Sequence, residues 1–315
     1  MKLKCALACV AAVLLSSEAC AALRTFVATT GVDTNTSVNC GPTAPCRTFN
    51  AALSVTDAGG EVVVLNSGGY GPATITQSVS ITAPDGVYAG VTVASGNTGF
   101  TITTPGVNVA LKGLTITGSG VAASNGVVVA VIGAVTLTVE NCVISNPSGT
   151  GIDFVGSGVL RVVDTLIRDS GWGVIVQGGS ADIVHSRLFG NDYGISISLG
   201  ATEPASTVVV TDSVVSGASQ SAIYVAAQAA SSNAQVSVVR STLSNNQYGV
   251  YAEALTGAVV QVSVSDSLVT GNTTGIYQFQ DATPGSSATL TSFGNNAFSG
   301  NATDETGTIT TTALK

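Results

Sequence analysis

Hydrophobic and polar residues alternate along most of this chain, and the alternation recurs in a repeat of about two dozen residues. Each copy reads as a strand, a polar corner, a small residue, an aliphatic residue, a turn with Asn or Gly, and a second strand. The copies begin at Leu137, Leu160, Ala181, Val208, Val236 and Val262, with a degenerate copy at Leu290. This pattern predicts a β-solenoid, in which each strand pairs with the coils above and below it.

The segments outside the regular repeat predict the ends of the solenoid. Thr48 to Val55 can form a short amphipathic helix that ends at Gly59-Gly60, and it would cap the first coil. The polar, Thr-rich C-terminal tail has no predicted secondary structure. We therefore expect four parts: a signal peptide (1–21), an extended segment with the capping helix (22–60), a parallel β-helix (61–301) and the polar tail (302–315).

Composition and charge narrow the choice of partners. Apolar residues make up 45% of the chain and charged residues only 9%, and Gly, Ser, Thr, Val and Ala dominate, as in strands and turns. A net charge of −8 and a pI of about 4.4 argue against binding to nucleic acid or to an anionic membrane. The same charge argues against unaided binding of a polyanionic polysaccharide.

The first residues have the features of an export signal. Lys2 and Lys4 precede an apolar run, Cys5 to Leu15, that is too short to span a bilayer. Ala19-Cys20-Ala21 fits the small-residue rule for signal cleavage. No other segment is both long and apolar enough to span a membrane, so we expect a secreted or periplasmic protein that begins at Ala22.

Three cysteines remain after this cleavage. Cys40 and Cys46 flank the turn-forming loop GPTAP in an oxidising compartment, which predicts a local disulfide. A metal site would need further ligands nearby, and the sequence has none there. Cys142 falls in a repeat position otherwise filled by Ser or Thr, which predicts a buried and unreactive thiol.

The N-terminal part of the sequence resembles a known superfamily. It has the segment PC-R-T-x-x-x-A followed by G-x-Y, seen in secreted bacterial right-handed parallel β-helix proteins of the pectin-lyase-like superfamily. The matching residues are Pro45, Cys46, Arg47, Thr48, Ala51, Gly69 and Tyr70. The resemblance implies an all-β fold, a right-handed parallel β-helix (β-solenoid) with a short N-terminal capping helix. The superfamily includes lyases, hydrolases, epimerases and adhesins, so the resemblance implies no single activity.

One corner of the repeat carries residues of alternating charge. In order along the chain they are Asp164, His185, Asp212, Arg240 and Asp266. Neighbouring coils lie about 4.8 Å apart, so these side chains would touch. One interpretation is an acid/base cluster centred on His185, the only histidine. The other is a structural ladder that relieves repulsion between like charges, and alternation across five coils favours it.

A second set of residues recurs on the outward face of the strand that follows the turn. It contains the only tryptophan and five of the seven tyrosines: Trp172, Tyr193, Tyr224, Tyr248, Tyr251 and Tyr277. Flat aromatic faces pack well against sugar rings, so this strip is a candidate binding surface for a polysaccharide or other glycan. An aromatic ladder that only stiffens the sheet is the alternative.

Carboxylates near this strip suggest an enzyme as a rival interpretation. Asp169 and Asp192 fall in the same turn of consecutive coils, roughly 7–9 Å apart, in the range for inverting glycoside hydrolysis. The segment GNDYGISI resembles the G-D-D-x-x-x-I coil of polygalacturonases, with Asn191 in place of its first aspartate. A lyase would instead use an arginine base such as Arg187, with calcium as its cofactor.

The sequence therefore favours an exported β-helix protein that binds or organises extracellular carbohydrate. A polysaccharide lyase, an inverting glycoside hydrolase and a structural surface protein without a ligand stay open as alternatives. No cofactor is expected apart from calcium in the lyase case. The oligomeric state is left open.

Overall fold

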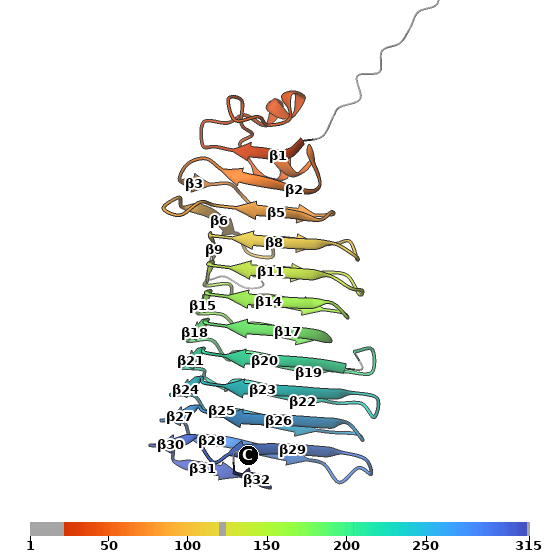
Figure 1. Ribbon diagram of the computed structural model, residues 1–315, viewed down its shortest axis with the longest axis vertical. Helices are drawn as coiled ribbons and strands as arrows, with labels where there is room; N and C mark the ends of the chain where they lie inside the picture. The colour runs from red at the N-terminus through yellow and green to blue at the C-terminus, as the bar shows by residue number, and fades with distance from the viewer. Residues whose placement is uncertain (1–21, 120–123, 204, 314–315) are drawn as a thin grey trace, which may run out of the picture.

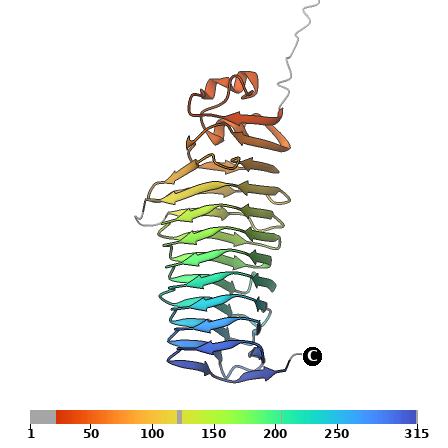
Figure 2. The same cartoon turned by 60° about the vertical axis from the view of Figure 1, so that its left-hand side comes forward.

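The computed structural model describes residues 22–119, 124–203 and 205–313, and the expected signal peptide lies outside them. Within these residues the chain winds into a stack of coils in which all paired strands are parallel, and the stack forms three long sheets (Figures 1 and 2). No helix in this part of the chain is long and apolar enough to cross a bilayer. The predicted β-solenoid is confirmed.

Sheet A contains the strand that starts each coil. Along the stack its strands are β1 (Ala22–Val27), β2 (Thr56–Val64), β5 (Val79–Thr82), β8 (Asn108–Lys112), β11 (Thr136–Glu140), β14 (Val159–Val163), β17 (Gly179–Val184), β20 (Ala205–Thr211), β23 (Asn233–Val239), β26 (Val259–Ser265), β29 (Ser287–Phe293) and β32 (Ile309–Thr312).

Sheet B follows sheet A in each coil and has the shortest strands. They are β3 (Gly68–Gly69), β6 (Ala89–Val93), β9 (Leu114–Gly118), β12 (Val143–Ser145), β15 (Leu166–Arg168), β18 (Arg187–Phe189), β21 (Val214–Ser216), β24 (Thr242–Ser244), β27 (Leu268–Thr270) and β30 (Ala297–Ser299).

Sheet C completes each coil. Its strands are β4 (Ala73–Ile75), β7 (Thr98–Ile102), β10 (Asn125–Val129), β13 (Thr150–Val155), β16 (Trp172–Gln177), β19 (Tyr193–Leu199), β22 (Ser221–Ala227), β25 (Tyr248–Ala254), β28 (Thr274–Gln280) and β31 (Thr303–Thr306).

The core fills the space between the three sheets. Every second residue of a strand points inward, so β20 buries Val208 and Val210 while Thr207 stays exposed. The residues in register on the next coil, Val236 and Val238, are also aliphatic. The interior is thus a set of aliphatic ladders, which is why the alternating pattern predicted the fold correctly.

The N-terminal end of the stack is closed by the predicted capping helix. The 3₁₀ helix η1 (Asp33–Val38) leads through the Cys40–Cys46 disulfide to α1 (Phe49–Leu53). The Thr48 hydroxyl accepts a hydrogen bond from the Ala51 amide (3.2 Å), which caps the first turn of α1. Phe49 is fully buried against the first coils. The predicted disulfide and helix are both present.

The stack is longer at both ends than the expected β-helix of residues 61–301. Strand β1 already pairs with β2, and β31 and β32 continue sheets C and A as far as Thr312. The polar tail therefore forms strands, because its threonines have a high β propensity and the preceding coil offers unpaired backbone groups.

In the coils from Asn141 to Gly271, two corners contain a residue in the left-handed conformation, and single corners of the flanking coils do so as well. At the first corner, between sheets A and B, these residues have φ between 46° and 70°: Gly113, Asn141, Asp164, His185, Asp212, Arg240 and Asp266. At the second corner, between sheets B and C, they are Asn146, Asp169, Gly190, Gly217, Asn245, Gly271 and Gly300. From Asn141 onward through Asp266, the second residue follows the first by five positions in every coil.

Buried polar side chains support both corners from the inside. At the first corner the Ser186 amide donates to Ser213 Oγ (3.1 Å), and the Ser213 amide donates to Ser241 Oγ (3.2 Å). At the second corner Asn246 Nδ2 donates to Asn272 Oδ1 (2.9 Å) in an asparagine ladder. These ladders satisfy the backbone amides of the tight corners, which would otherwise be buried without partners.

The predicted fate of Cys142 is also confirmed. The thiol is free and buried in the small-residue column of the first corner. Burial is the main reason that its pKa is raised, to about 12. A thiol with such a pKa does not form the reactive thiolate at neutral pH.

Candidate functional site

Six aromatic side chains lie on the outer face of sheet C, in the strands β16, β19, β22, β25 and β28. Trp172 is in register with Tyr193, and Tyr224, Tyr251 and Tyr277 form a second register column. Tyr248 lies beside that column at the start of β25. The rings belong to five consecutive coils, and we call them the aromatic strip.

The rings of the aromatic strip contact one another without a break. Trp172 stacks on Tyr193 with the ring centroids 6.2 Å apart and the planes inclined by 7°. Tyr193 contacts Tyr224 at 5.5 Å, and Tyr224 contacts Tyr251 at 5.3 Å. Tyr277 lies 4.7 Å from Tyr251. The strip is therefore one continuous aromatic surface along the axis of the stack.

The members of the strip differ in exposure. Trp172 is 41% exposed and lies at one end, while the tyrosines are half-buried against each other. Phe279, 39% exposed, lies in β28 two residues beyond Tyr277 and extends the apolar surface at the other end. None of these side chains points into the core, so filling the core does not explain their size.

Glu253 anchors the middle of the strip. Its carboxylate accepts a hydrogen bond from Tyr224 Oη at 2.5 Å and a longer one from Tyr251 Oη at 3.4 Å. Desolvation by burial, followed by the nearby Glu253 carboxylate, raises the pKa of both tyrosines above the usual value. Both hydroxyls thus stay protonated and are oriented. The sequence pattern indicated none of these contacts.

A second carboxylate near the strip is unusually placed. Asp153 in β13 is in register with Ile175 of β16, one coil before the strip begins. Its Oδ1 atom is buried without a hydrogen-bond partner, and desolvation raises the pKa of this carboxyl group.

The candidate catalytic residues lie at the second corner and on sheet B. Asp169 forms an ion pair with the adjacent Arg168, and Asp192 Oδ1 accepts a hydrogen bond from Ser219 Oγ of the following coil (2.6 Å). Arg187 is exposed at the start of β18. Asp169 and Asp192 therefore have different partners, although they lie at the same corner of consecutive coils. Their assignment to catalysis stays a prediction.

The charged column at the first corner has the contacts expected of a ladder. Arg240 binds Asp212 through two hydrogen bonds, Nε to Oδ1 (2.9 Å) and Nη2 to Oδ2 (2.8 Å). His185 lies between Asp164 (4.0 Å) and Asp212 (3.8 Å). Asp266 accepts from Asn295 Nδ2 at 2.5 Å. Each side chain has a neighbour of opposite charge or a hydrogen-bond donor, which agrees with a structural role.

Among the described residues, no three His, Cys, Asp or Glu side chains gather closely enough to hold a metal ion. The calcium predicted for the lyase case stays untested.

Comparison with known proteins decides the family. The family described as "Right handed beta helix region" matches residues 98–257, which is half of the chain and includes the first five rings of the strip. The chain belongs to the right-handed β-helix family.

Solved structures of other β-helix proteins share this fold. An alginate lyase from Paenibacillus sp. str. FPU-7 is 15% identical, covers 92% of this chain and 100% of its own, and has a TM-score of 0.55. The pectate lyase Pel9A is also 15% identical, covers 93% of this chain and 78% of its own, and has a TM-score of 0.54. At this identity the similarity concerns the fold alone. No curated protein matches the sequence.

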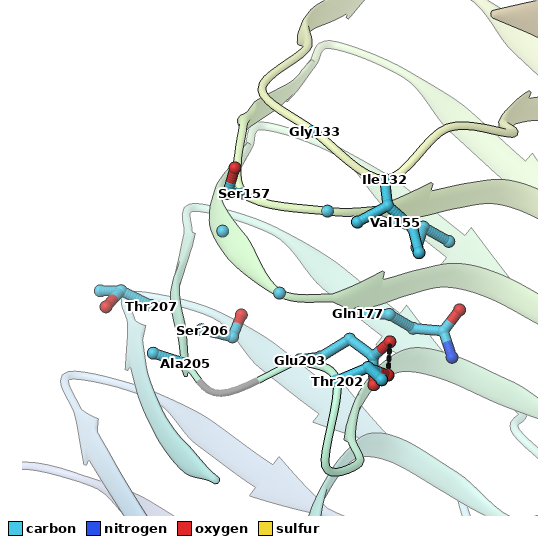
Figure 3. Close-up of a pocket in the computed structure, with 13 residues that line it drawn as sticks. Ile132, Gly133, Val155, Ser157, Gln177, Thr202, Glu203, Ala205, Ser206 and Thr207 are labelled. Atoms are coloured by element: carbon cyan, nitrogen blue, oxygen red, sulfur yellow. Dashed lines mark hydrogen bonds between the residues drawn. The ribbon is translucent and has the colours of Figure 1, made fainter. Parts of the chain in front are cut away.

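This family member also has a cavity, of about 380 Å³, at the third corner, between sheets C and A. Figure 3 shows Ile132 and Val155 on one side of it and Thr202 and Glu203 on the other. Val155 and Gln177 end their strands, whereas Trp172 begins β16. The cavity therefore lies at the far end of the strands from the first column of the strip and forms a separate feature.

Proposed function

We propose that this protein binds an extended polysaccharide along the outer face of sheet C, with the aromatic strip as the contact surface. The observation that supports the proposal most directly is the unbroken contact of six rings from five consecutive coils. A sugar ring offers C–H groups on its flat faces, and an aromatic ring packs well against them. A linear polysaccharide repeats along one axis, as the strip does.

The fold itself does not require aromatic residues at these positions. Other coils have Thr150, Ser221 and Thr274 in the column of Trp172, and Asp153, Ile175 and Ser196 in the column of Tyr224. Small polar and aliphatic residues thus pair equally well in the same sheet. Exposed aromatic residues gathered on one face are characteristic of a binding surface.

The names of the similar structures agree with a carbohydrate ligand. Alginate lyase and pectate lyase are both named for polysaccharides. The Cys40–Cys46 disulfide supports the expected secreted or periplasmic location, where such polymers occur.

A polysaccharide lyase or inverting glycoside hydrolase is the second candidate. Asp192 directly precedes Tyr193 of the strip, so a glycan bound to the rings would pass close to this carboxylate. Asp169, Asp192 and Arg187 would then carry the reaction. In that case polysaccharide incubated with the protein gains unsaturated ends from a lyase or new reducing ends from a hydrolase.

Substitutions in the strip test the proposed binding. Trp172→Ala and Tyr224→Ala should each weaken binding to a cognate polysaccharide by about 1 kcal/mol, or about fivefold in Kd, because each loses one ring contact. Trp172 is the only tryptophan, so its fluorescence should shift on titration. Isothermal titration calorimetry with a panel of soluble polysaccharides measures the affinity.

Tyr88→Ala provides a matched control, because Tyr88 is 53% exposed and lies outside the strip. This variant should bind as the wild type does. Affinity unchanged in both strip variants, with folding intact by circular dichroism, would contradict the proposal and leave a structural role for the rings.

A further inference from the structure

The five tyrosines of the aromatic strip lie in a section of the chain that is almost free of cations. Between Leu188 and Leu314 the sequence has one lysine or arginine, Arg240, against eight aspartates and glutamates. Arg240 is held by both oxygens of Asp212 at the first corner, between sheets A and B. The one cation of this section is thus already paired, and it does not belong to sheet C.

The charges that border the five tyrosines are negative, and at the Trp172 end Arg168 is already paired with Asp169. Glu253 lies among the rings and is fixed there by Tyr224 and Tyr251. Asp192 is exposed beside Tyr193, and Asp153 lies in β13 next to the first strand of the strip. Over the described residues, the strands of sheet C contain no lysine or arginine.

We infer that the aromatic strip selects polysaccharides without carboxylate groups, with Glu253 as a specificity-determining residue. This inference rests on the proposed function and names its substrate class. A polyuronate would bring a negative charge on every sugar close to Glu253 and Asp192. Sheet C has no guanidinium or ammonium group that could pair with those charges. Removing water from a carboxylate without giving it a partner makes the free energy of binding less favourable.

An uncharged polysaccharide fits the same surface. Its C–H faces pack on the rings, and its hydroxyl groups can donate to the Glu253 carboxylate, which is an acceptor at every oxygen. Because two tyrosine hydroxyls already orient this carboxylate, little side-chain freedom is lost when a sugar hydroxyl binds. The Glu253 carboxylate thus repels uronates and accepts hydrogen bonds from a neutral polysaccharide.

The test is a comparison of neutral and acidic polymers on the full mature chain. The neutral probes are glucomannan, galactomannan and fully methyl-esterified polygalacturonate, and the acidic probes are alginate and polygalacturonate. The esterified and free polygalacturonates share one backbone and differ in the methyl esters that remove the charge of the carboxylates. Affinity electrophoresis and calorimetry at low salt should show at least one neutral polymer bound about tenfold more tightly than either acidic polymer.

Glu253→Gln tests the assigned residue. Glutamine keeps an acceptor for the tyrosine hydroxyls but removes the charge, so binding of the acidic polymers should strengthen by about threefold or more. The control variant Glu203→Gln removes one negative charge at the third corner, away from the strip. It should change the affinity neither for the neutral nor for the acidic polymers. High salt should narrow the wild-type difference between neutral and acidic polymers, since it screens the repulsion.

The outcomes separate the two proposals. Acidic polymers bound as tightly as neutral ones, or an unchanged preference in Glu253→Gln, would overturn the inference and leave the binding function in place. No binding of any polymer by the wild-type chain would overturn the proposed function itself.

Discussion

Two columns of stacked side chains run along this β-helix, one at the first corner and one on the outer face of sheet C. They differ in what the backbone requires of them. Every member of the corner column from Gly113 to Asp266 has a positive φ, whereas the residues of the aromatic strip lie in extended strands. The corner column therefore accepts few residue types, while the strip positions accept many.

This difference distinguishes residues that recur because the fold requires them from residues that recur because of function. Gly, Asn, Asp and His tolerate the left-handed conformation best, and most members of the corner column are of these types. Alternating charges then allow such residues to stack in successive coils without repulsion between neighbours. The strip positions are filled by Thr, Ser or Asp in other coils, so their aromatic residues need a reason other than folding. A recurrent residue indicates function only where the fold leaves the choice open.

The inner support of a corner should be the most sensitive to substitution. Asn272→Ala removes a buried amide that accepts hydrogen bonds from Asn246 and donates to Leu243 O (3.1 Å) and Asn301 Oδ1 (3.0 Å). Because buried partners lose their bonds, we expect the free energy of unfolding to fall by about 2–3 kcal/mol. Chemical denaturation measures it. Thr273→Ala, at the exposed neighbour, should change it by less than about 0.5 kcal/mol.

The outer corner column should show a backbone effect of intermediate size. His185 has φ +50°, which a β-branched residue adopts only with strain. His185→Val should lower the free energy of unfolding by about 1–2 kcal/mol, and His185→Asn should be nearly neutral. Denaturant titration of both variants separates conformation from charge. An equal loss in the two would mean that the imidazole contacts, and not the backbone, determine this position.

The smallest effects should appear in the pH dependence of stability, with the two columns responding at opposite ends. The hydrogen bond from Arg240 is the main reason that the pKa of Asp212 is lowered, so its contribution is complete above about pH 4 and is lost as pH falls further. The pKa values of Tyr224 and Tyr251 are raised, so the contribution of the strip is complete below about pH 10 and is lost as pH rises.

Unfolding midpoints measured across pH check this. Asp212→Asn should flatten the acid side only, and the double variant Tyr224→Phe and Tyr251→Phe should flatten the alkaline side only. Absorbance at 295 nm should show tyrosines that ionise later than free tyrosine. Midpoints that respond to both variants at the same end would contradict the separation of the two columns.

The fold and the aromatic strip could be predicted from the sequence because both depend on periodicity. The repeat gives the register, and register alone brings Trp172 beside Tyr193 and Tyr251 beside Tyr277. The hydrogen bonds of Glu253 could not be predicted, because they depend on how far two tyrosine side chains lean along the stack. The residue types of the first corner column, mostly Gly, Asn and Asp, also indicate a left-handed backbone. From the sequence, only the charges of this column were interpreted.

The turn before sheet C is shifted by one residue in one coil, and the repeat pattern did not show it. The Ala218 amide donates to Asn246 Oδ1 (2.8 Å), and the exposed Ser219 hydroxyl donates to Asp192 Oδ1 (2.6 Å). The coil after Gly217 has one more residue before its sheet C strand than the coil after Gly190, and a residue inserted within a turn does not disturb the apolar pattern on either side.

The constant spacing of the two left-handed corners has a consequence for how this protein can change in length. The left-handed residues of the two corners are five positions apart in each coil from Asn141 to Asp266, whereas the loops between sheets C and A range from one residue after β16 to six after β28. The number of residues per coil therefore varies at the third corner, while the strands of sheets C and A on either side stay in register. New loops could be grafted there, along the edge of the face that carries the rings, without rebuilding the scaffold that supports them.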